Sequence, residues 1–455
     1  MSVLNNARWI AVSQISRSAA QLIGVVVLAR LLEPAEYGLM AMATVVIAFA
    51  SIFREMGTAA ALIQKRELSD RTTTAVFWFN VITGVSIALV IAAFTPLIAR
   101  GFRSDALSTV IWALVPVFPI ASLASAHQAL LERESQFKLL ARIEVSSAVA
   151  SLILAVVLAL NGAGVYSLVA QTLATAALST GQLWVASRWQ PRVRVAWSEL
   201  RAVLGFSSNL VGFNLVNFLA RNADSMIIGR YIGSAALGTY SLAYKLMLFP
   251  TQNLTFVVGR SMFPIMSRQQ DDVARNAALY LKSVGAVAMI TAPLMSGAFM
   301  LRTPLVHIVF GAQWAAGAGV LAWLAPVGFL QSIVSTTGTV FMAYGKTATL
   351  MRLGIFCAVL QVGSFIAGVP YGVVGVAACY FVANLIIAPV CLWLAMRELG
   401  GGTMALLKSL IAPVASSAIM CLALWLLRIG APLLSASVVG FGASCLAGAA
   451  VYFLA

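Results

Sequence analysis

The sequence predicts an all-α integral membrane protein. Hydrophobic residues make up 61% of its 455 positions and charged residues only 9%, whereas a soluble domain carries about 25% charged residues. The net charge of +15 comes from Lys and Arg that are spread singly along the chain. It does not form the dense basic patch that nucleic-acid binding requires. Apolar stretches long enough to cross a bilayer recur along the whole chain.

We expect about fourteen transmembrane helices, because a helix needs about 20 apolar residues to cross the hydrocarbon core. The first stretch is long enough to span and lacks a convincing cleavage site, so we expect it to remain as a helix instead of being removed as a signal peptide. The expected helices cover residues 9–31, 38–62, 74–99, 108–130, 143–160, 165–187, 203–229, 237–262, 279–301, 318–341, 350–369, 373–395, 409–427 and 435–454.

The distribution of Lys and Arg between alternate loops predicts the orientation. Eighteen lie at the N-terminus or in the loops after the even-numbered helices, and six lie in the other loops. Because positive loops remain on the cytoplasmic side, both termini are expected in the cytoplasm. The loops on the far side are short, so no extramembrane domain of any size is expected.

An internal repeat organises the expected helices. Arg30–Gly38 aligns without gaps on Arg230–Gly238, and near an offset of 210 Pro116 aligns with Pro326 and Arg142 with Arg352. We therefore expect two parallel six-helix repeats, as two lobes over residues 1–202 and 203–400, followed by two additional helices over residues 401–455. Parallel repeats of this kind are typical of transporters in which two lobes rock around a central site.

Basic residues inside the apolar stretches are the main indication of function. A charge near the bilayer centre costs roughly 2.5–3.5 kcal/mol or more, so it usually faces the protein interior or a water-filled cavity. Two acids, Glu55 and Asp224, accompany five bases, which leaves a net positive charge and predicts an anion-binding cavity. The five bases are Arg17, Arg54, Arg221, Lys245 and Arg260.

Each of these residues also has a structural interpretation. Arg17 lies mid-span with no acid one turn away, which favours binding, but it would also serve as a link between helices. Arg221 and Asp224 are three residues apart, so they could neutralise each other or act in ion coupling or gating. Glu55 could pair with a base at a gate, and Lys245 and Arg260 are placed where they could extend toward the membrane surface.

Several motifs resemble those of the polysaccharide transporter family of Wzx-type flippases, and especially its WzxC-like branch. The resemblance is most specific over residues 15–145. It is carried by the run LARLLEPAEYG over Leu28–Gly38, then Gly57, Ala61–Gln64, Phe77–Asn80, Arg133, Phe137–Lys138 and Glu144. The family belongs to the multidrug/oligosaccharidyl-lipid/polysaccharide exporter superfamily. The motif residues themselves suit helix ends and a tight turn, so we interpret them as determinants of the fold.

The resemblance implies a flippase of the bacterial inner membrane. It would move an undecaprenyl-diphosphate-linked oligosaccharide from the cytoplasmic to the periplasmic leaflet by alternating access, for exopolysaccharide, capsule or O-antigen synthesis. A polymerase and glycosyltransferases of the same pathway are the implied protein partners. Buried arginines agree with this substrate, because a guanidinium binds phosphate oxygens in pairs.

Two alternatives remain. A multidrug exporter of the same superfamily would bind organic cations and would favour buried carboxylates. A membrane polymerase or ligase that acts on the lipid-linked saccharide would need a sizeable far-side loop, which is not expected here. The sequence contains no Walker loop and no Ser-His-Asp arrangement that we can identify, and the histidines His127 and His307 lack companions at metal-ligand spacing. We therefore expect no enzymatic activity, no cofactor and no metal site.

Overall fold

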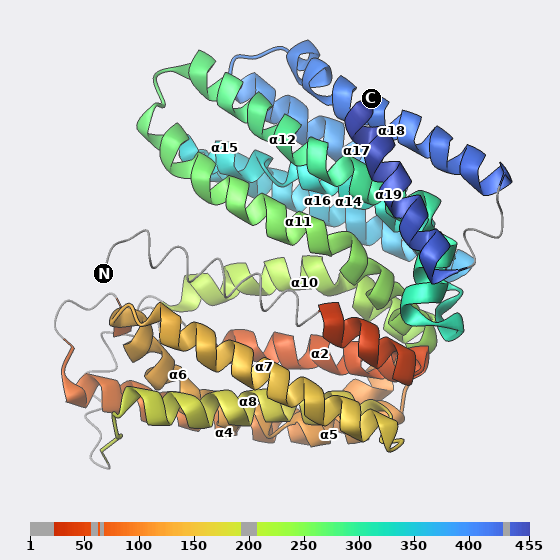
Figure 1. Cartoon of the computed structure of the whole chain (residues 1–455). Helices are drawn as coiled ribbons and strands as arrows, with labels where there is room; N and C mark the ends of the chain where they lie inside the picture. The colour runs from red at the N-terminus through yellow and green to blue at the C-terminus, as the bar shows by residue number, and fades with distance from the viewer. Residues whose placement is uncertain (1–21, 56–61, 64–67, 193–206, 431–436) are drawn as a thin grey trace. The chain divides into compact units, whose positions relative to one another are not determined.

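The computed structural model describes residues 22–55, 62–63, 68–192, 207–430 and 437–455, and every regular element in these ranges is a helix (Figure 1). A few side chains within the described helices, those of Glu55 and Arg260 among them, are not described. By internal packing the chain divides into two compact units, Met1–Gly238 and Thr239–Ala455. We describe each unit separately.

The first unit is a bundle of long helices joined by short turns. The short break between α5 and α6 falls at Val115 and Pro116, where a proline removes a backbone donor. The helices are Leu22–Leu31, α2 (Pro34–Glu55), α4 (Asp70–Phe102), α5 (Ala106–Leu114), α6 (Val117–Arg133), α7 (Phe137–Leu160), α8 (Val165–Ser187) and α10 (Ser207–Tyr231).

The start of α2 explains the motif that the sequence analysis singled out. Pro34 is the first residue of the helix, a position where the missing N–H costs nothing. The Glu36 side chain accepts a hydrogen bond from the Glu33 backbone N–H at 2.8 Å, and the Tyr37 hydroxyl donates to the Val25 carbonyl at 3.3 Å. These contacts fix the turn between the first two described helices, and they give this part of the motif a structural role at a helix end.

The second unit begins within α11 (Ser234–Arg268) and has irregular structure between α12 and α14. There, α13 (Arg302–Leu305) is followed by a π-helical turn at Val306–Phe310 and a 3₁₀ turn at Ala312–Trp314. The other helices are α12 (Val273–Met300), α14 (Gly317–Val334), α15 (Thr337–Ala343), α16 (Thr347–Gly368), α17 (Gly372–Glu398), α18 (Thr403–Gly430) and α19 (Val438–Leu454), with a short 3₁₀ turn at Val369–Tyr371.

Both units pack their helices in the same order. In the first, α4 packs on α6, α6 on α8 and α8 on α7; in the second, α12 packs on α14, α14 on α17 and α17 on α16. Elements that the sequence repeat makes equivalent therefore have equivalent neighbours. In the second unit, α18 also packs against α12, and α19 packs against α18. The lobe boundary near residue 203 stays a prediction.

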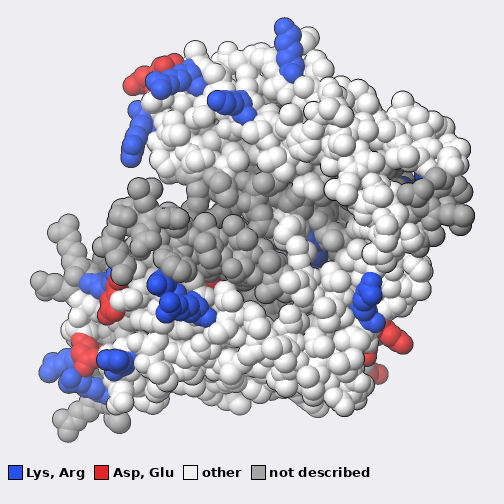
Figure 2. Space-filling view, viewed as in Figure 1, with Lys and Arg blue, Asp and Glu red and all other residues white. Residues whose placement is uncertain are grey.

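The helices have the dimensions and surfaces of a multi-pass membrane protein. Each of the fourteen expected ranges overlaps a described helix or two consecutive ones, and within the described residues eight candidate spans are long and apolar enough to cross a membrane. Large apolar side chains such as Leu89, Val185 and Val359 are more than 60% exposed, as expected where lipid is the solvent. On the face in Figure 2, broad uncharged areas separate the few Lys and Arg side chains.

Candidate functional site

Two of the five expected cations lie on neighbouring helices of the first unit. Arg54 is in the last turn of α2, and Arg221 is on α10, which packs against α2. The two helices run antiparallel, because Phe49 of α2 contacts Phe218 of α10 with ring centroids 5.8 Å apart, while the beginning of α2 meets the chain just beyond the end of α10 at Gly38 and Ser234. We call this contact the α2–α10 seam.

The two arginines occupy different levels along the seam. Arg54 follows Phe49 by five residues on α2, and Arg221 follows Phe218 by three residues on the antiparallel α10. With a rise of 1.5 Å per residue, their levels differ by about 12 Å along the helix axes. Arg54 is half-buried and Arg221 is exposed. One phosphate group is too small to bridge this separation between the two levels.

Asp224 has surroundings that differ from those of Arg221. Its side chain is 3% exposed, and one carboxylate oxygen accepts the Ser225 backbone N–H at 2.6 Å. Although both side chains are described, Arg221 and Asp224 form no ion pair. Arg221 thus keeps its charge at the surface of α10, and Asp224 places a carboxyl group in the packed interior of the first unit.

The other expected residues are only partly described. Arg17 lies outside the described residues. Glu55 is the last residue of α2 and Arg260 lies on α11, but their side chains are outside the described set. Lys245, in the second unit, has an exposed side chain on α11, one residue after Tyr244, whose ring stacks on Tyr240 at 5.6 Å. Of the five expected bases, the structure therefore places Arg54 and Arg221 at the α2–α10 seam of the first unit and Lys245 in the second unit.

A buried polar cluster in the second unit was not identified from the sequence. The Gln331 side-chain amide on α14 donates to the Tyr380 hydroxyl and, at 3.5 Å, to the Asn384 carbonyl oxygen, both on α17. The Asn384 amide also donates to the Tyr380 backbone carbonyl at 2.8 Å. The spacing of Tyr380 and Asn384, one helical turn apart in an apolar span, was the available signal. Gln331 donates to two residues of α17, which indicates a role in joining α14 to α17.

The two histidines differ in their surroundings: His127 is packed between helices, and His307 is exposed. His127 is fully buried, its Nδ1 lies 2.7 Å from the Ser187 hydroxyl, and its ring lies 4.6 Å from that of Trp184. These contacts join α6 to the end of α8. His307 is exposed in the π-helical turn. Within the described ranges, no group of three or more His, Cys, Asp or Glu side chains is arranged to hold a metal ion.

Comparison with known proteins identifies the family to which these features belong. The model of a family described as "Polysaccharide biosynthesis protein" matches residues 27–318. The teichuronic acid biosynthesis protein TuaB of Bacillus subtilis (strain 168) is 28% identical over 380 residues, which cover 80% of this chain and 78% of TuaB. The lipopolysaccharide biosynthesis protein WzxC of Escherichia coli (strain K12) is 25% identical over 386 residues, which cover 84% and 78% of the two chains.

Solved structures share the fold. The lipid II flippase MurJ in an inward closed conformation superposes with a TM-score of 0.79 at 15% identity, over 97% of this chain and 96% of MurJ. An inward-facing multidrug resistance MATE family transporter of the MOP superfamily gives a TM-score of 0.63 at 16% identity, over 86% and 98% of the two chains. At these identities the superpositions establish the fold alone.

Proposed function

Because this chain belongs to the polysaccharide biosynthesis family that contains the Wzx-like transporters, we propose that it is a flippase for a lipid-linked oligosaccharide. The proposed substrate is an undecaprenyl-diphosphate-linked repeat unit, moved from the cytoplasmic to the periplasmic leaflet by alternating access. The product would serve exopolysaccharide, capsule or O-antigen synthesis. Family membership together with the transporter fold carries the proposal.

The names of the relatives support a transport role. Besides TuaB and WzxC, the succinoglycan biosynthesis transport protein ExoT of Rhizobium meliloti (strain 1021) is 27% identical over 371 residues, which cover 81% of this chain and 74% of ExoT. Each of these names places its protein in the synthesis of a bacterial polysaccharide. A role in translocating a polysaccharide precursor agrees with all of them.

The cations supply a chemical reason for this substrate. A diphosphate bridge carries negative charge and cannot enter hydrocarbon without compensation, and guanidinium groups bind its oxygens bidentately. We propose that Arg17, Arg54, Arg221, Lys245 and Arg260 contribute to binding. Arg54 and Arg221, at levels about 12 Å apart along the seam, would hold the diphosphate at successive stages. Asp224 and Glu55 are the proposed ion-coupling or gating residues.

The proposed location is the bacterial inner membrane with both termini in the cytoplasm. The eighteen-to-six distribution of Lys and Arg between alternate loops supports this orientation. A polymerase and glycosyltransferases of the same pathway are the proposed protein partners, because a translocated repeat unit is made and consumed by such enzymes.

Leaflet-resolved detection of the lipid-linked repeat unit tests the function. In cells that lack the protein, assembled repeat units are expected to accumulate on the cytoplasmic leaflet. A lectin or periplasmic glycosidase added to spheroplasts should then find little substrate, whereas inverted vesicles should expose it. Wild-type cells provide the control.

Other outcomes identify the alternatives. Accumulation on the periplasmic leaflet would contradict a flippase and indicate a polymerase or ligase. Unchanged lipid-linked sugars combined with altered tolerance of organic cations would indicate a drug exporter.

A further inference from the structure

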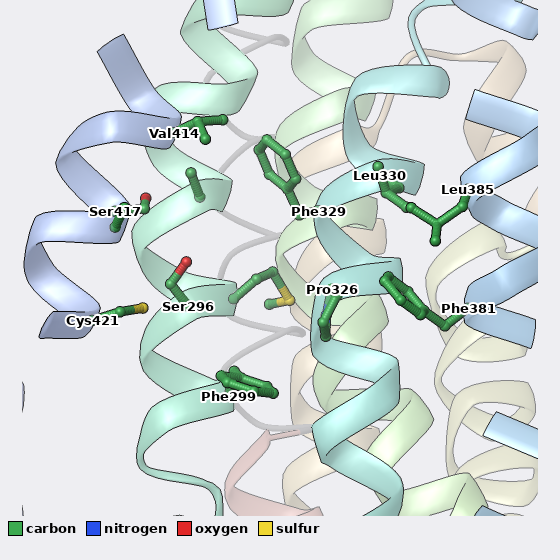
Figure 3. Close-up of a pocket in the computed structure, with 13 residues that line it drawn as sticks. Ser296, Phe299, Pro326, Phe329, Leu330, Phe381, Leu385, Val414, Ser417 and Cys421 are labelled. Carbon is green, nitrogen blue, oxygen red and sulfur yellow. The ribbon is translucent and has the colours of Figure 1, made fainter. Parts of the chain in front are cut away.

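A groove with a volume of about 350 Å³ lies within the second unit, between α12, α14, α17 and α18 (Figure 3). Ala292 and Met295 form its floor and are 4% and 6% exposed. Leu385 of α17 and Val414 of α18 lie at its edges and are 48% and 47% exposed. The groove is therefore closed at its base and opens between α17 and α18, which make few contacts with each other.

The lining of the groove is suited to a hydrocarbon chain. Most of the side chains that line it are aliphatic or aromatic, including Phe299, Phe329 and Phe381. The groove follows the membrane-spanning parts of its helices, where lipid and not water is the solvent. From Ala292 to Phe299 it extends seven residues along α12, or about 10 Å. This length fits within one leaflet, which is half of a hydrocarbon core about 30 Å thick.

A polar group without a partner lies in the wall. The Ser417 side chain is 6% exposed, and its hydroxyl makes no hydrogen bond within the described residues. Other serines of the unit, such as Ser409 and Ser332, donate to a backbone carbonyl three residues earlier. Ser417 lies at the groove next to α12 (Figure 3).

A cation lies at one end of the groove. The numbering of the lining residues increases in the same direction on α12 and α18 (Figure 3), so both helices end on the same side. Arg302 follows the lining residue Phe299 by one turn: its guanidinium lies 5.0 Å from the centre of the Phe299 ring, and it donates to the Phe299 carbonyl at 2.8 Å. No described acidic side chain forms an ion pair with Arg302.

We propose that this groove and Arg302 form a binding site for one phospholipid of the bilayer, with an acyl chain in the groove and the phosphate on Arg302. A guanidinium has five N–H donors in a planar array that matches phosphate oxygens, and the Phe299 carbonyl uses only one side of it. Basic residues at the ends of grooves between membrane helices are suited to anionic lipid head groups. Arg302 is one of only six Lys and Arg residues in the far-side loops of the predicted topology. This site is separate from the α2–α10 seam of the first unit.

Arg428 extends the same cationic end. It lies in the last turn of α18, seven residues beyond the lining residue Cys421, or about 10 Å further along the helix. Its side chain is exposed. A head group with a net negative charge is therefore favoured over a zwitterionic one, whose ammonium group would face these arginines.

Native mass spectrometry of the purified full-length protein in phosphatidylglycerol and phosphatidylcholine tests the proposal. The wild type is expected to retain one phosphatidylglycerol molecule after detergent exchange, in preference to phosphatidylcholine. Arg302→Ala should weaken phosphatidylglycerol binding roughly tenfold or more, because a hydrogen bond to a charged group is removed. Ala418→Phe, which fills the groove, should abolish retention of either lipid.

Matched controls separate the site from general effects. Arg100→Ala removes an arginine in the last turn of α4 on the same side of the predicted topology, and Ala415→Phe adds the same ring to α18 at an exposed residue that does not line the groove. Both should retain the lipid. Equal retention by Arg302→Ala, Ala418→Phe and the wild type would overturn the proposal. Retention of a polyprenyl phosphate instead of a phospholipid in cell-derived protein would also overturn it. Because bound lipid is measured directly, failure here leaves the proposed transport function untouched.

Discussion

Arg221 and Asp224 show how neighbouring residues on one helix can differ in role. Their spacing places them within one turn, which suggested either a neutralised pair or a functional site. The structure places the aspartate in the packed interior and the arginine at the surface. Sequence could locate both charges because they interrupt an apolar run. It could not give their burial, since burial depends on the helices that pack against α10, such as α2, which is separated from α10 by about 150 residues.

This difference predicts that substitution of the arginines reduces export, whereas substitution of Asp224 reduces stability. Arg54→Ala and Arg221→Ala should reduce polymer export roughly tenfold or more, because each removes a charge-assisted contact to phosphate, while membrane abundance stays near the wild-type level. Arg54→Lys should restore export in part, since an ammonium lacks the guanidinium fork. Arg142→Ala on α7 is the control and should export normally. Normal export in both alanine variants would remove the role of the seam in anion binding.

Asp224→Ala should act on folding. The substitution removes a side chain that is only 3% exposed and leaves a cavity inside the first unit, a type of change that typically costs about 0.5–3 kcal/mol. The purified variant should therefore unfold at a lower temperature than Arg221→Ala, as measured by a thermal denaturation assay in detergent. Equal denaturation temperatures for the two variants would contradict a packing role for the carboxylate.

At the scale of the helices, the two copies of the repeat meet at glycines. A Cβ on Gly38 would overlap the Ser234 carbonyl oxygen, and a Cβ on Gly238 would overlap the Pro34 carbonyl oxygen. Residues 34 and 38 correspond to residues 234 and 238 in the aligned repeat, so the contact is reciprocal. The beginnings of α2 and α11 thus cross with their backbones in direct contact. Immediately after this crossing, at Thr239, the second unit begins.

Alanine at either glycine is expected to disrupt this crossing. Gly38→Ala and Gly238→Ala should each destabilise the protein by about 1–3 kcal/mol or more, because the obstructing atoms belong to the backbone and cannot rotate away. Gly181→Ala on α8, where a Cβ meets nothing within 4 Å, should be neutral or slightly stabilising. Yield of folded protein by size-exclusion chromatography measures the effect. Wild-type yields for Gly38→Ala and Gly238→Ala would show that the helices can separate at no cost.

Helix positions were predictable because long apolar runs leave few alternatives in a bilayer. The expected range 165–187 and the observed α8 coincide. The irregular turns over Val306–Trp314 fall in the loop expected between helices 279–301 and 318–341, whereas the break between α14 and α15, at Ser335 and Thr336, was not predicted. The break falls at the polar run Ser335–Thr339, but apolar residues on both sides made the stretch from 318 to 341 long enough for one continuous span. The glycine crossing was likewise not predictable, because only the three-dimensional contact identifies which glycines require the missing side chain.

At the scale of the whole molecule, the fold and the family were predictable, while the groove at Arg302 was not. The Leu28–Gly38 motif identified the family because its residues perform local tasks at a helix start, where few residue types suffice. The groove is formed by four helices between residues 273 and 430, and no local pattern distinguishes its lining from the apolar residues that face lipid.

The loop charges predict the orientation of the whole chain, with both termini in the cytoplasm. Single cysteines at Arg71 and Arg192, which lie near the helix ends predicted to be cytoplasmic, should react with a thiol reagent only when the reagent can cross the membrane. Both side chains are exposed, so burial should not limit the reaction. Arg192 forms an ion pair with Asp70 at 2.6 Å, an exposed pair whose loss should cost less than about 1 kcal/mol.

Cysteines at Asp105 and Ala312, exposed at the other ends of the helices, should react with an impermeant reagent added to intact spheroplasts. The native cysteines should be replaced first, because Cys445 is exposed. Since Asp105 and Arg71 lie at opposite ends of the span formed by α4, a chain that crosses the membrane there must give opposite results at the two positions. Reversed accessibility at all four positions would invert the orientation, and with it the cytoplasmic-to-periplasmic direction proposed for transport.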